Sequence, residues 1–307
     1  MSNSPARPAP TMLAWILLIL LGLVWGGSFL GVAKALDGFG PLTIAAGRIG
    51  IAAVILTAVA VVSGMGLPPA NTATGRSFWL HCLGMGIFSN ALPFALLAWG
   101  QERVSSGFAG ITMAIVPLLV LPLAHAFVPG ERMTLRKAIG FVIGFFGVAL
   151  LVGQGGGEAG GAVGLARLAC VAASCCYAVG AIITRLAPPA PTVAFAAASL
   201  LIASAISIPL ALVFEGWPAS PPPAALVGLL YLGVFPTALA TLALVYVIQS
   251  AGPTFMSLVN YQVPVWAVIL GLVFLDEVVP PQFAGALALI LAGLAVSQLR
   301  LPALGRS

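Results

Sequence analysis

Charged residues are scarce in this chain. Asp, Glu, Lys and Arg together make up 6% of the 307 residues, whereas hydrophobic residues make up 61%. Soluble domains carry about 25% charged residues, so this sequence has too few to cover the surface of a water-soluble globule. The scarcity excludes a soluble protein and predicts an integral membrane protein whose partner is the lipid bilayer.

Cysteine and histidine are also rare, with four cysteines and two histidines in the whole chain. The cysteines all lie in apolar stretches, and Cys175 and Cys176 are adjacent, which fits neither a disulfide framework nor spaced zinc ligands. We therefore expect no metal and no cofactor. The twelve Lys and Arg residues are scattered singly, without the basic run that would follow a phosphate backbone, and this disfavours nucleic-acid binding.

Ten long apolar stretches appear when the sequence is divided at its prolines, glycines and charge clusters. A membrane-spanning helix needs about 20 mostly apolar residues. We expect such helices at residues 12–33, 41–63, 77–99, 104–126, 134–152, 162–184, 192–214, 224–248, 254–274 and 282–300. The first stretch is longer than the roughly 7–15-residue core of a signal peptide, so we interpret it as the first span. The predicted fold class is an all-α integral membrane protein with ten transmembrane helices.

A glycine-rich run lies at the middle of the chain, and we interpret residues 153–161 as a flexible linker. The run has no lysine, which a phosphate-binding P-loop requires, so direct use of ATP is disfavoured. On this interpretation residues 1–152 form a first five-helix repeat and residues 162–307 form a second one.

The two halves resemble each other at an offset of 147 residues. This offset places Gly86-Ile-Phe-Ser-Asn-Ala-Leu92 over Gly233-Val-Phe-Pro-Thr-Ala-Leu239, and Pro117 over Pro264. Because five is an odd number of crossings, the second copy must enter the membrane upside down. Such a 5+5 inverted-topology repeat is typical of secondary transporters, which bind substrate near the bilayer midplane between the two copies.

Basic residues predict the orientation in the membrane. An even number of spans puts both termini on one face, and that face collects most of the basic residues. They are Arg7, Arg76, Arg132, Arg136, Lys137, Arg185, Arg300 and Arg306. The opposite face has only Lys34, Arg103 and Arg167. The positive-inside rule therefore places both termini in the cytoplasm.

Several short motifs occur in a characteristic order. They are Trp25-Gly-Gly-Ser-Phe29, Pro41-Leu-Thr-Ile-Ala-Ala-Gly-Arg48, Gly130-Glu-Arg-Met-Thr134 and Phe274-Leu-Asp-Glu277. In order, spacing and ten-span frame the whole chain resembles the EamA-type branch of the drug/metabolite transporter superfamily, and within it the YddG-like amino-acid exporters. The resemblance implies a 5+5 carrier of a bacterial-type inner membrane, commonly an exporter of amino acids or other metabolites. The sequence departs from the family at Ser174-Cys-Cys-Tyr177, where an aromatic residue is usual early in span six.

Ionisable residues within lipid depth are costly and are therefore functional candidates. Arg48 lies one or two turns into the second span, where it either attracts a substrate carboxylate or binds backbone carbonyls of a broken helix. Lys34, at the outer end of the first span, either assists an anionic group or anchors the helix at the interface. No span has an Asp or Glu near its centre, which favours facilitated export over proton antiport.

Neutral polar and aromatic residues are the candidates for a substrate pocket, because small-molecule sites have apolar walls with a few polar groups. The candidate substrate-binding residues are Trp25, Ser28, His81, Asn90, Trp99, Tyr177, Tyr246, Asn260, Tyr261 and Gln262. Trp99 and Tyr246 also fit an aromatic belt at the interface, and Asn260 and Gln262 also fit hydrogen bonding between helices.

Four prolines lie inside predicted spans, at Pro93, Pro117, Pro236 and Pro264. Each removes a backbone donor and permits a bend. Such bends suit hinges that gate a pathway, and they equally suit static kinks that improve packing.

The sequence thus predicts a secondary transporter, and not an enzyme, that exports small metabolites by alternating access. Its small-molecule substrate is most simply a neutral or aromatic amino acid, and its assembly is a monomer or a homodimer. The alternatives on the same frame are a drug-like amphiphile and a nucleotide sugar, although the latter needs clustered basic residues at mid-depth. An intramembrane enzyme would need a catalytic pair such as two embedded acids or Ser and His, and none is evident.

Overall fold

The structure is a computed structural model that describes residues 10–153, 161–217 and 220–298. Within these residues ten helical spans are long and apolar enough to cross a membrane, which confirms the predicted all-α membrane fold. Their bounds differ from the predicted ones by at most four residues, the largest difference being the start of span three. The predicted linker lies outside the described residues except at its two ends, so the division of the chain at 153–161 stays a prediction.

Six of the spans are single unbroken helices. They are α1 (Met12–Leu36), α2 (Pro41–Val62), α7 (Leu135–Val152), α8 (Ala162–Leu186), α9 (Thr192–Phe214) and α14 (Pro281–Gln298). Several helices begin where a side chain accepts a hydrogen bond from an otherwise unpaired backbone N–H, as Thr134 does from Lys137 at the start of α7. Local sequence therefore fixes these helix starts.

The other four spans are interrupted. Span three consists of α3 (Ala73–Met85), the π-helical segment η1 (Gly86–Ala91) and α4 (Leu92–Gln101). Span four consists of α5 (Ser106–Met113) and α6 (Val116–Phe127). Span eight consists of α10 (Pro223–Leu232), the π-helical segment η2 (Gly233–Leu239) and α11 (Ala240–Ala251), and span nine consists of α12 (Pro253–Met256) and α13 (Val259–Phe274).

These interruptions follow the internal repeat. Spans three and four of the first half correspond to spans eight and nine of the second, and η1 and η2 begin at Gly86 and Gly233, the two aligned glycines. Single π-helical turns within α-helices occur mostly at functional sites. The repeat therefore preserves a backbone irregularity as well as the pattern of apolar residues.

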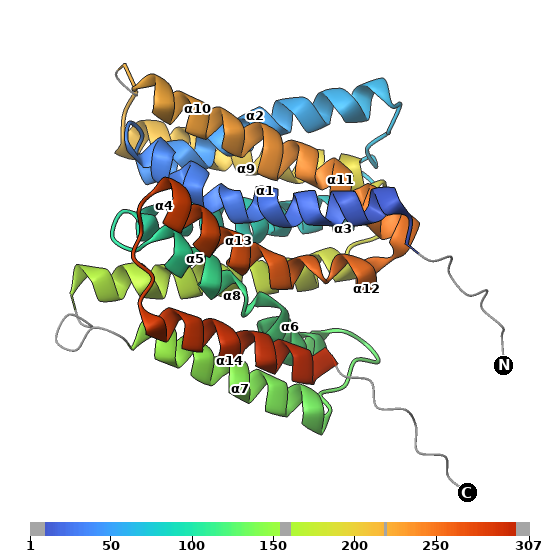
Figure 1. Ribbon diagram of the computed structural model, residues 1–307. Coiled ribbons are helices and arrows are strands. Elements are labelled where there is room, and N and C mark those ends of the chain that lie inside the picture. Colours follow the sequence, from blue (N-terminus) through green and yellow to red (C-terminus); the bar gives the residue numbers. More distant parts are fainter. Residues whose placement is uncertain (1–9, 154–160, 218–219, 299–307) are drawn as a thin grey trace, which may run out of the picture.

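Equivalent spans also pack against each other across the interface between the halves. Helix α2 packs on α9, and α7 lies alongside α14 at one edge of the bundle (Figure 1). Helices α7 and α14 approach each other closely at Gly140 and Gly293. A Cβ at either position would collide with the backbone of the opposite helix. Small residues allow such close helix approach in lipid, so these glycines are part of the scaffold.

The bundle has two chemically different ends. The first turn of α1 and the last turn of α14 lie at the same end (Figure 1). We call this the basic end, because its described residues include Arg76, Arg132, Arg136, Lys137 and Arg185. The opposite, acidic end carries Asp37, Glu102, Glu215, Asp276 and Glu277 together with Lys34, Arg103 and Arg167. Of the other four basic residues, Arg48 lies inside α2, and Arg7, Arg300 and Arg306 lie outside the described residues.

Candidate functional site

The two π-helical segments are stabilised by the same type of hydrogen bond. The Asn90 side-chain amide donates to the Met85 carbonyl at 3.2 Å, and the Thr237 hydroxyl donates to the Leu232 carbonyl at 2.8 Å. Both pairs are five residues apart and are aligned with each other by the repeat. A widened helical turn leaves carbonyls without their usual partners, and in lipid these must be satisfied by nearby groups. Asn90 therefore supports the backbone of span three.

Arg48 reaches from α2 to the second of these segments. Its side chain is buried, with the residue only 5% exposed, and its Nε and Nη2 donate to Thr237 Oγ1 at 3.4 and 3.2 Å. The guanidinium carbon lies 3.7 Å from the centre of the Phe94 ring, a favourable cation–π geometry. In the described part of the chain no carboxylate forms an ion pair with Arg48.

Such a charge is unusual in the middle of a membrane protein. A charged side chain within the bilayer core is costly unless it is paired or faces a polar cavity. The hydroxyl of Thr237 and the face of Phe94 provide only part of the stabilisation that the Arg48 guanidinium would have in water. Tyr177 and Tyr231 also interact electrostatically with the guanidinium. The arrangement is an aromatic and hydroxyl-lined site with one unneutralised positive charge.

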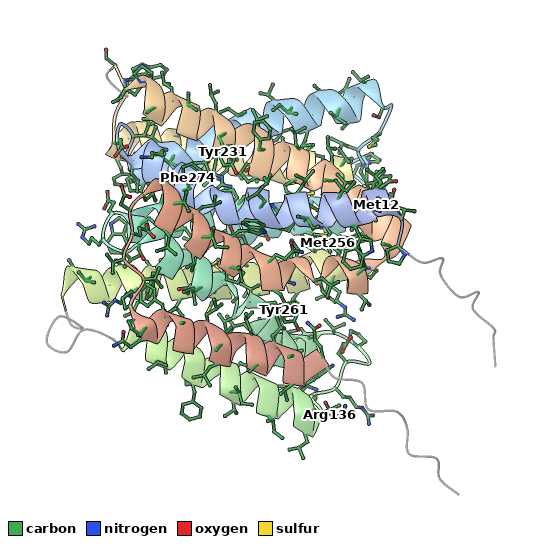
Figure 2. All side chains as sticks on the ribbon, viewed as in Figure 1. Met12, Arg136, Tyr231, Met256, Tyr261 and Phe274 are labelled. Carbon is green, nitrogen blue, oxygen red and sulfur yellow. The ribbon has the colours of Figure 1, made fainter. Side chains whose placement is uncertain are left out.

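Two further aromatic residues fasten span one to span eight beside this site. Trp25 donates its indole N–H to the Pro236 carbonyl at 3.0 Å, and Tyr231 donates its hydroxyl to the Val24 carbonyl at 3.1 Å. Figure 2 places Tyr231 between α10 and α1. A Cβ at Gly27 would lie 2.6 Å from the Tyr231 hydroxyl, so the glycine makes room for this contact. Trp25 thus supports the irregular backbone of η2.

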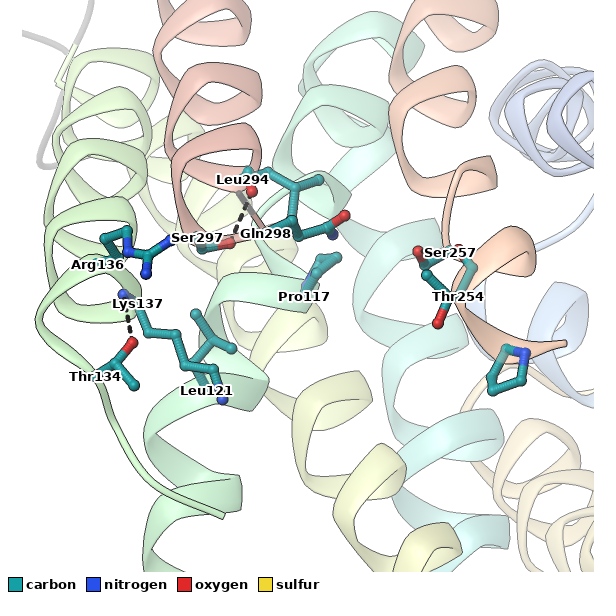
Figure 3. A pocket seen from close by; sticks show the side chains of 11 residues that line it. Pro117, Leu121, Thr134, Arg136, Lys137, Thr254, Ser257, Leu294, Ser297 and Gln298 are labelled. Atoms are coloured by element: carbon teal, nitrogen blue, oxygen red, sulfur yellow. Dashed lines mark hydrogen bonds between the residues drawn. The ribbon is translucent and has the colours of Figure 1, made fainter. Parts of the chain in front are cut away.

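A cavity of about 760 Å³ opens at the basic end of the bundle. It lies between α6, α7, α12 and α14, with Thr254 of α12 and Ser257, the residue after α12, facing Pro117 of α6 (Figure 3). Arg136 and Lys137 of α7 also line it. We call this cavity the vestibule. Its volume is within the range of roughly 300–1,000 Å³ that small-molecule sites occupy.

Tyr261 and Tyr177 pack against the apolar clusters that include residues of the vestibule wall and of the Arg48 surroundings. Tyr261, on α13, packs against the same apolar cluster as Leu121 and Leu294 of the vestibule wall (Figure 2). Tyr177 packs against that cluster and also against a second one that contains Phe94, whose ring centre is 6.4 Å from its own. Tyr177 therefore contacts both clusters, and the second one contains Phe94, over whose ring the Arg48 guanidinium lies.

Three other predicted site residues have local or peripheral contacts. The Nδ1 of His81 is 2.7 Å from the Ser77 carbonyl one turn earlier, and because a carbonyl only accepts, this nitrogen carries the proton. Trp99 is 37% exposed with Arg103 over its ring, and Tyr246 is 41% exposed. These placements match the belt alternative for Trp99 and Tyr246, and a substrate role for the three residues stays a prediction.

The polar residues of span nine have different surroundings. Asn260 donates to the carbonyl of Ser257, which lines the vestibule, at 3.1 Å. Gln262 packs against α1, where a Cβ at Gly22 would lie 2.8 Å from its Oε1. Ser28 is half-buried on α1. Of these residues Asn260 lies nearest to the vestibule lining, and Gln262 serves helix packing.

The four prolines relate differently to the interruptions. Pro93 is the second residue of α4, which follows η1, Pro236 lies within η2, and Pro117 is the second residue of α6, after the turn that separates it from α5. In span nine α13 continues through Pro264, and the interruption lies earlier, between α12 and α13. Three of the prolines thus mark interruptions, whereas Pro264 does not, and their action as hinges stays a prediction.

The remaining charged candidate, Lys34, lies away from Arg48. It is exposed near the acidic end and borders a mainly apolar groove of about 330 Å³ between α1 and α10. Sequence reasoning missed Phe94, Thr237 and Tyr231, which contact or face Arg48. The alignment of Thr237 with Asn90 was a signal that could have identified one of them.

The structure gives no sign of a metal centre. Within the described residues no three His, Cys, Asp or Glu side chains are grouped so that they could hold an ion.

Comparisons with known proteins agree with this architecture. A model of the EamA-like transporter family matches twice, over residues 12–153 and 164–298, and each match contains five of the spans. The chain is 26% identical to a probable terminal-alkyne amino-acid exporter of Streptantibioticus cattleyicolor, over 90% of each protein. It is 25% identical to the uncharacterized inner membrane transporter YedA of Escherichia coli, over 83% of this chain and 80% of YedA.

A solved crystal structure shares the fold. It has a TM-score of 0.66 and 23% sequence identity, and the match covers 93% of this chain and 96% of the other. The family match spans nearly the whole chain in two inverted halves, with odd numbers of crossings in each. The chain therefore belongs to the EamA-like transporter family, and it is a multi-pass membrane transporter and not an enzyme.

Proposed function

We propose that this transporter exports neutral amino acids, with aromatic ones preferred, from the cytoplasm across the inner membrane by alternating access. The observation that carries the proposal is the buried, unneutralised Arg48 guanidinium among aromatic side chains. A guanidinium binds a carboxylate through charge-assisted, often bidentate hydrogen bonds. The surrounding rings offer apolar surface to the side chain of an aromatic amino acid.

The alternative cargoes fit these residues less well. A nucleotide sugar carries two charged phosphates, whereas Arg48 is the buried basic side chain in the described part of the chain. A cationic amphiphile would be repelled by Arg48. The relative from Streptantibioticus cattleyicolor, described as a probable amino-acid exporter, also supports an amino acid.

The vestibule and the charge asymmetry support the proposed direction of transport. The basic end faces the cytoplasm under the positive-inside rule, so both termini are cytoplasmic and the vestibule opens to the inside. YedA, described as an inner membrane transporter, supports the same location. Within the described spans no Asp or Glu lies at mid-depth, so we expect the amino-acid gradient to drive export without an obligatory proton.

The two five-helix units, residues 1–152 and 162–307, would then rock about Arg48 as rigid halves joined by residues 153–161. A monomer contains both halves and suffices for this mechanism, and a homodimer is compatible with it.

The test is flux in proteoliposomes with and without a pH gradient. We expect phenylalanine to exchange across the membrane without a gradient, and phenylalaninamide, which lacks the carboxylate, to be a poor cargo. A charge-assisted hydrogen bond contributes about 1.5–3 kcal/mol, so Arg48→Met should raise the KM for phenylalanine about 10- to 150-fold.

The matched control is Lys34→Met, which removes an exposed basic residue and should leave the KM unchanged. Tyr261→Ala should reduce flux, because Tyr261 packs against the apolar cluster that includes Leu294 of the vestibule wall. Equal transport of phenylalanine and its amide by the unaltered protein would refute carboxylate recognition. No amino-acid flux under any condition would refute the proposed cargo.

A further inference from the structure

Two glutamates at the acidic end connect the halves of the protein in a way that the cargo site does not explain. Glu215 follows α9 and Glu277 follows α13, both in the second half. Each extends its carboxylate to the first turn of a helix in the first half. The helix that Glu215 reaches is α2, and the helix that Glu277 reaches is α5. Spans seven and two, and spans nine and four, are equivalent pairs of the inverted repeat.

Glu277 binds the start of α5 with three hydrogen bonds. The Ser106 backbone N–H donates to Oε1 at 2.6 Å, and the Gly107 N–H and the Ser106 hydroxyl donate to Oε2 at 3.1 and 3.0 Å. Ser105 caps the next N–H, that of Phe108, at 3.1 Å. The carboxylate thus satisfies N–H groups that have no partner within the helix and lies at the positive end of its dipole.

The local backbone places Glu277 for this contact. Asp276 adopts a left-handed conformation with φ of 52°, which Asp tolerates better than most residues, and the Glu277 N–H returns to the Gly271 carbonyl at 3.2 Å. A Cβ at Gly271 would collide with the Glu277 carboxylate, so only glycine leaves the necessary space. Asp276 and Gly271 therefore both allow the Glu277 carboxylate to reach the start of α5.

Glu215 makes a matching contact with α2. Its Oε1 accepts the Leu42 N–H at 2.8 Å, and its Oε2 accepts the Thr43 N–H and hydroxyl at 2.8 and 2.7 Å. Gly40 precedes the helix without a side-chain cap of its own, and a Cβ there would overlap the carboxylate. The second half thus supplies the side-chain cap that α2 lacks, and at α5 it adds to the cap that Ser105 provides.

The basic end has no such connection between equivalent spans in the described part of the chain. Glu131, in the loop after span four, binds Arg185 and Lys137 instead, at 2.5 and 3.3 Å. The residue aligned with Ser106 is Pro253, which has no N–H to donate. Here the vestibule separates α6 of span four from α12 of span nine. The same two spans are joined at the acidic end and apart at the basic end.

We propose that Glu215 and Glu277 form a latch that closes the outer end of the transporter, and that both contacts must break before cargo leaves on that side. The proposal rests on the proposed alternating-access export, and it assigns gating residues to that mechanism. The latch makes the inward-open arrangement the resting one, which suits an exporter that loads from the cytoplasm. Cargo binding must then offset the loss of the two contacts when the halves rock.

The test is cysteine accessibility in cells, using a functional protein from which the four native cysteines have been replaced. Val268→Cys reports on the outer end, because Val268 packs beside Gly107 behind the latch. Thr254→Cys reports on the vestibule. A membrane-impermeant thiol reagent is applied from the outside for the first reporter, and from the inside of inverted vesicles for the second.

We expect Glu277→Gln combined with Glu215→Gln to raise outer labelling of Val268→Cys at least about tenfold and to lower inner labelling of Thr254→Cys. Removing even one charge-assisted hydrogen bond changes an equilibrium by about this factor. Asp37→Asn is the matched control, because it alters another exposed acid of the acidic end that takes no part in the hydrogen bonds of Glu215 and Glu277, and it should change neither rate.

Reciprocal changes distinguish a gate from a general loss of structure, since unfolding would raise both rates. Unchanged rates in the double variant, or a rise at both reporters, would overturn the latch. The labelling comparison does not depend on cargo flux, so reciprocal labelling without amino-acid flux in proteoliposomes would refute the proposed cargo and leave the latch standing.

Discussion

The contact between Arg48 and Thr237 yields a quantitative prediction. The Thr237 hydroxyl accepts hydrogen bonds from Arg48 and donates one to the Leu232 carbonyl. Thr237→Val keeps the shape of the side chain and removes all of these bonds. A buried polar group left without a partner costs about 1–3 kcal/mol, and measured interhelical hydrogen bonds in membrane proteins average about 0.6 kcal/mol. We expect the free energy of unfolding to fall by about 1–3 kcal/mol.

The assay is equilibrium unfolding in mixed micelles of increasing SDS fraction, applied to Thr237→Val, Arg48→Met and the double variant. Because the two side chains share their hydrogen bonds, the double variant should lose less than the sum of the single losses. The coupling should lie between about 0.5 and 3 kcal/mol. Thr241→Val is the control, because its hydroxyl bonds only to the Thr237 carbonyl of its own helix, at 2.6 Å. Additive losses, within about 0.3–0.5 kcal/mol, would refute the network.

Two further predictions concern the scaffold. Gly293→Ala should lower the free energy of unfolding by about 1–3 kcal/mol, because the added Cβ would lie 2.7 Å from the backbone nitrogen of Gly144. Gly285→Ala, where the added Cβ would have its nearest neighbour 3.8 Å away, should not lower the free energy of unfolding in the same SDS unfolding assay. Hydrogen bonds from Arg185 and Lys137 lower the pKa of Glu131. The contribution of the ionised Glu131 to the free energy of unfolding is therefore present above the ordinary glutamate pKa of about 4.3. It is lost as the pH falls through the lowered pKa. Glu131→Gln should lower the free energy of unfolding by less than about 1 kcal/mol at pH 7 and leave it unchanged in strong acid. A difference between the variant and the unaltered protein that persists in acid would contradict this.

The ten spans and their inverted repeat were predictable because lipid imposes a simple rule. Every span must be apolar along about 20 residues, and only prolines, glycines and charges interrupt the pattern. The aligned heptapeptides at Gly86 and Gly233 even marked the sites of the two π-helical segments. The alignment did not predict that these segments would be π-helical. That conformation depends on which side chains donate hydrogen bonds to the backbone carbonyls that the widened turn leaves unpaired.

The candidate site was only partly predictable. Arg48 could be identified from the sequence because a buried charge in lipid is rare. Its partner Thr237 is 189 residues away in the sequence, and nothing in the local sequence distinguishes it from the other threonines in the spans. Trp25 and Asn90 were predicted as substrate ligands, and the structure shows both bonded to backbone carbonyls of irregular segments. Glu215 and Glu277 were not among the predicted functional residues, because capping a helix of the other half leaves no local sequence pattern.

The most direct test of the central claim is a binding titration of the purified protein with phenylalanine and phenylalaninamide. The account predicts saturable binding of phenylalanine, at least about tenfold weaker binding of the amide, and loss of this difference in Arg48→Met. Equal binding of acid and amide by the unaltered protein, or a preference that survives Arg48→Met, would contradict the role of Arg48 as the carboxylate-binding residue.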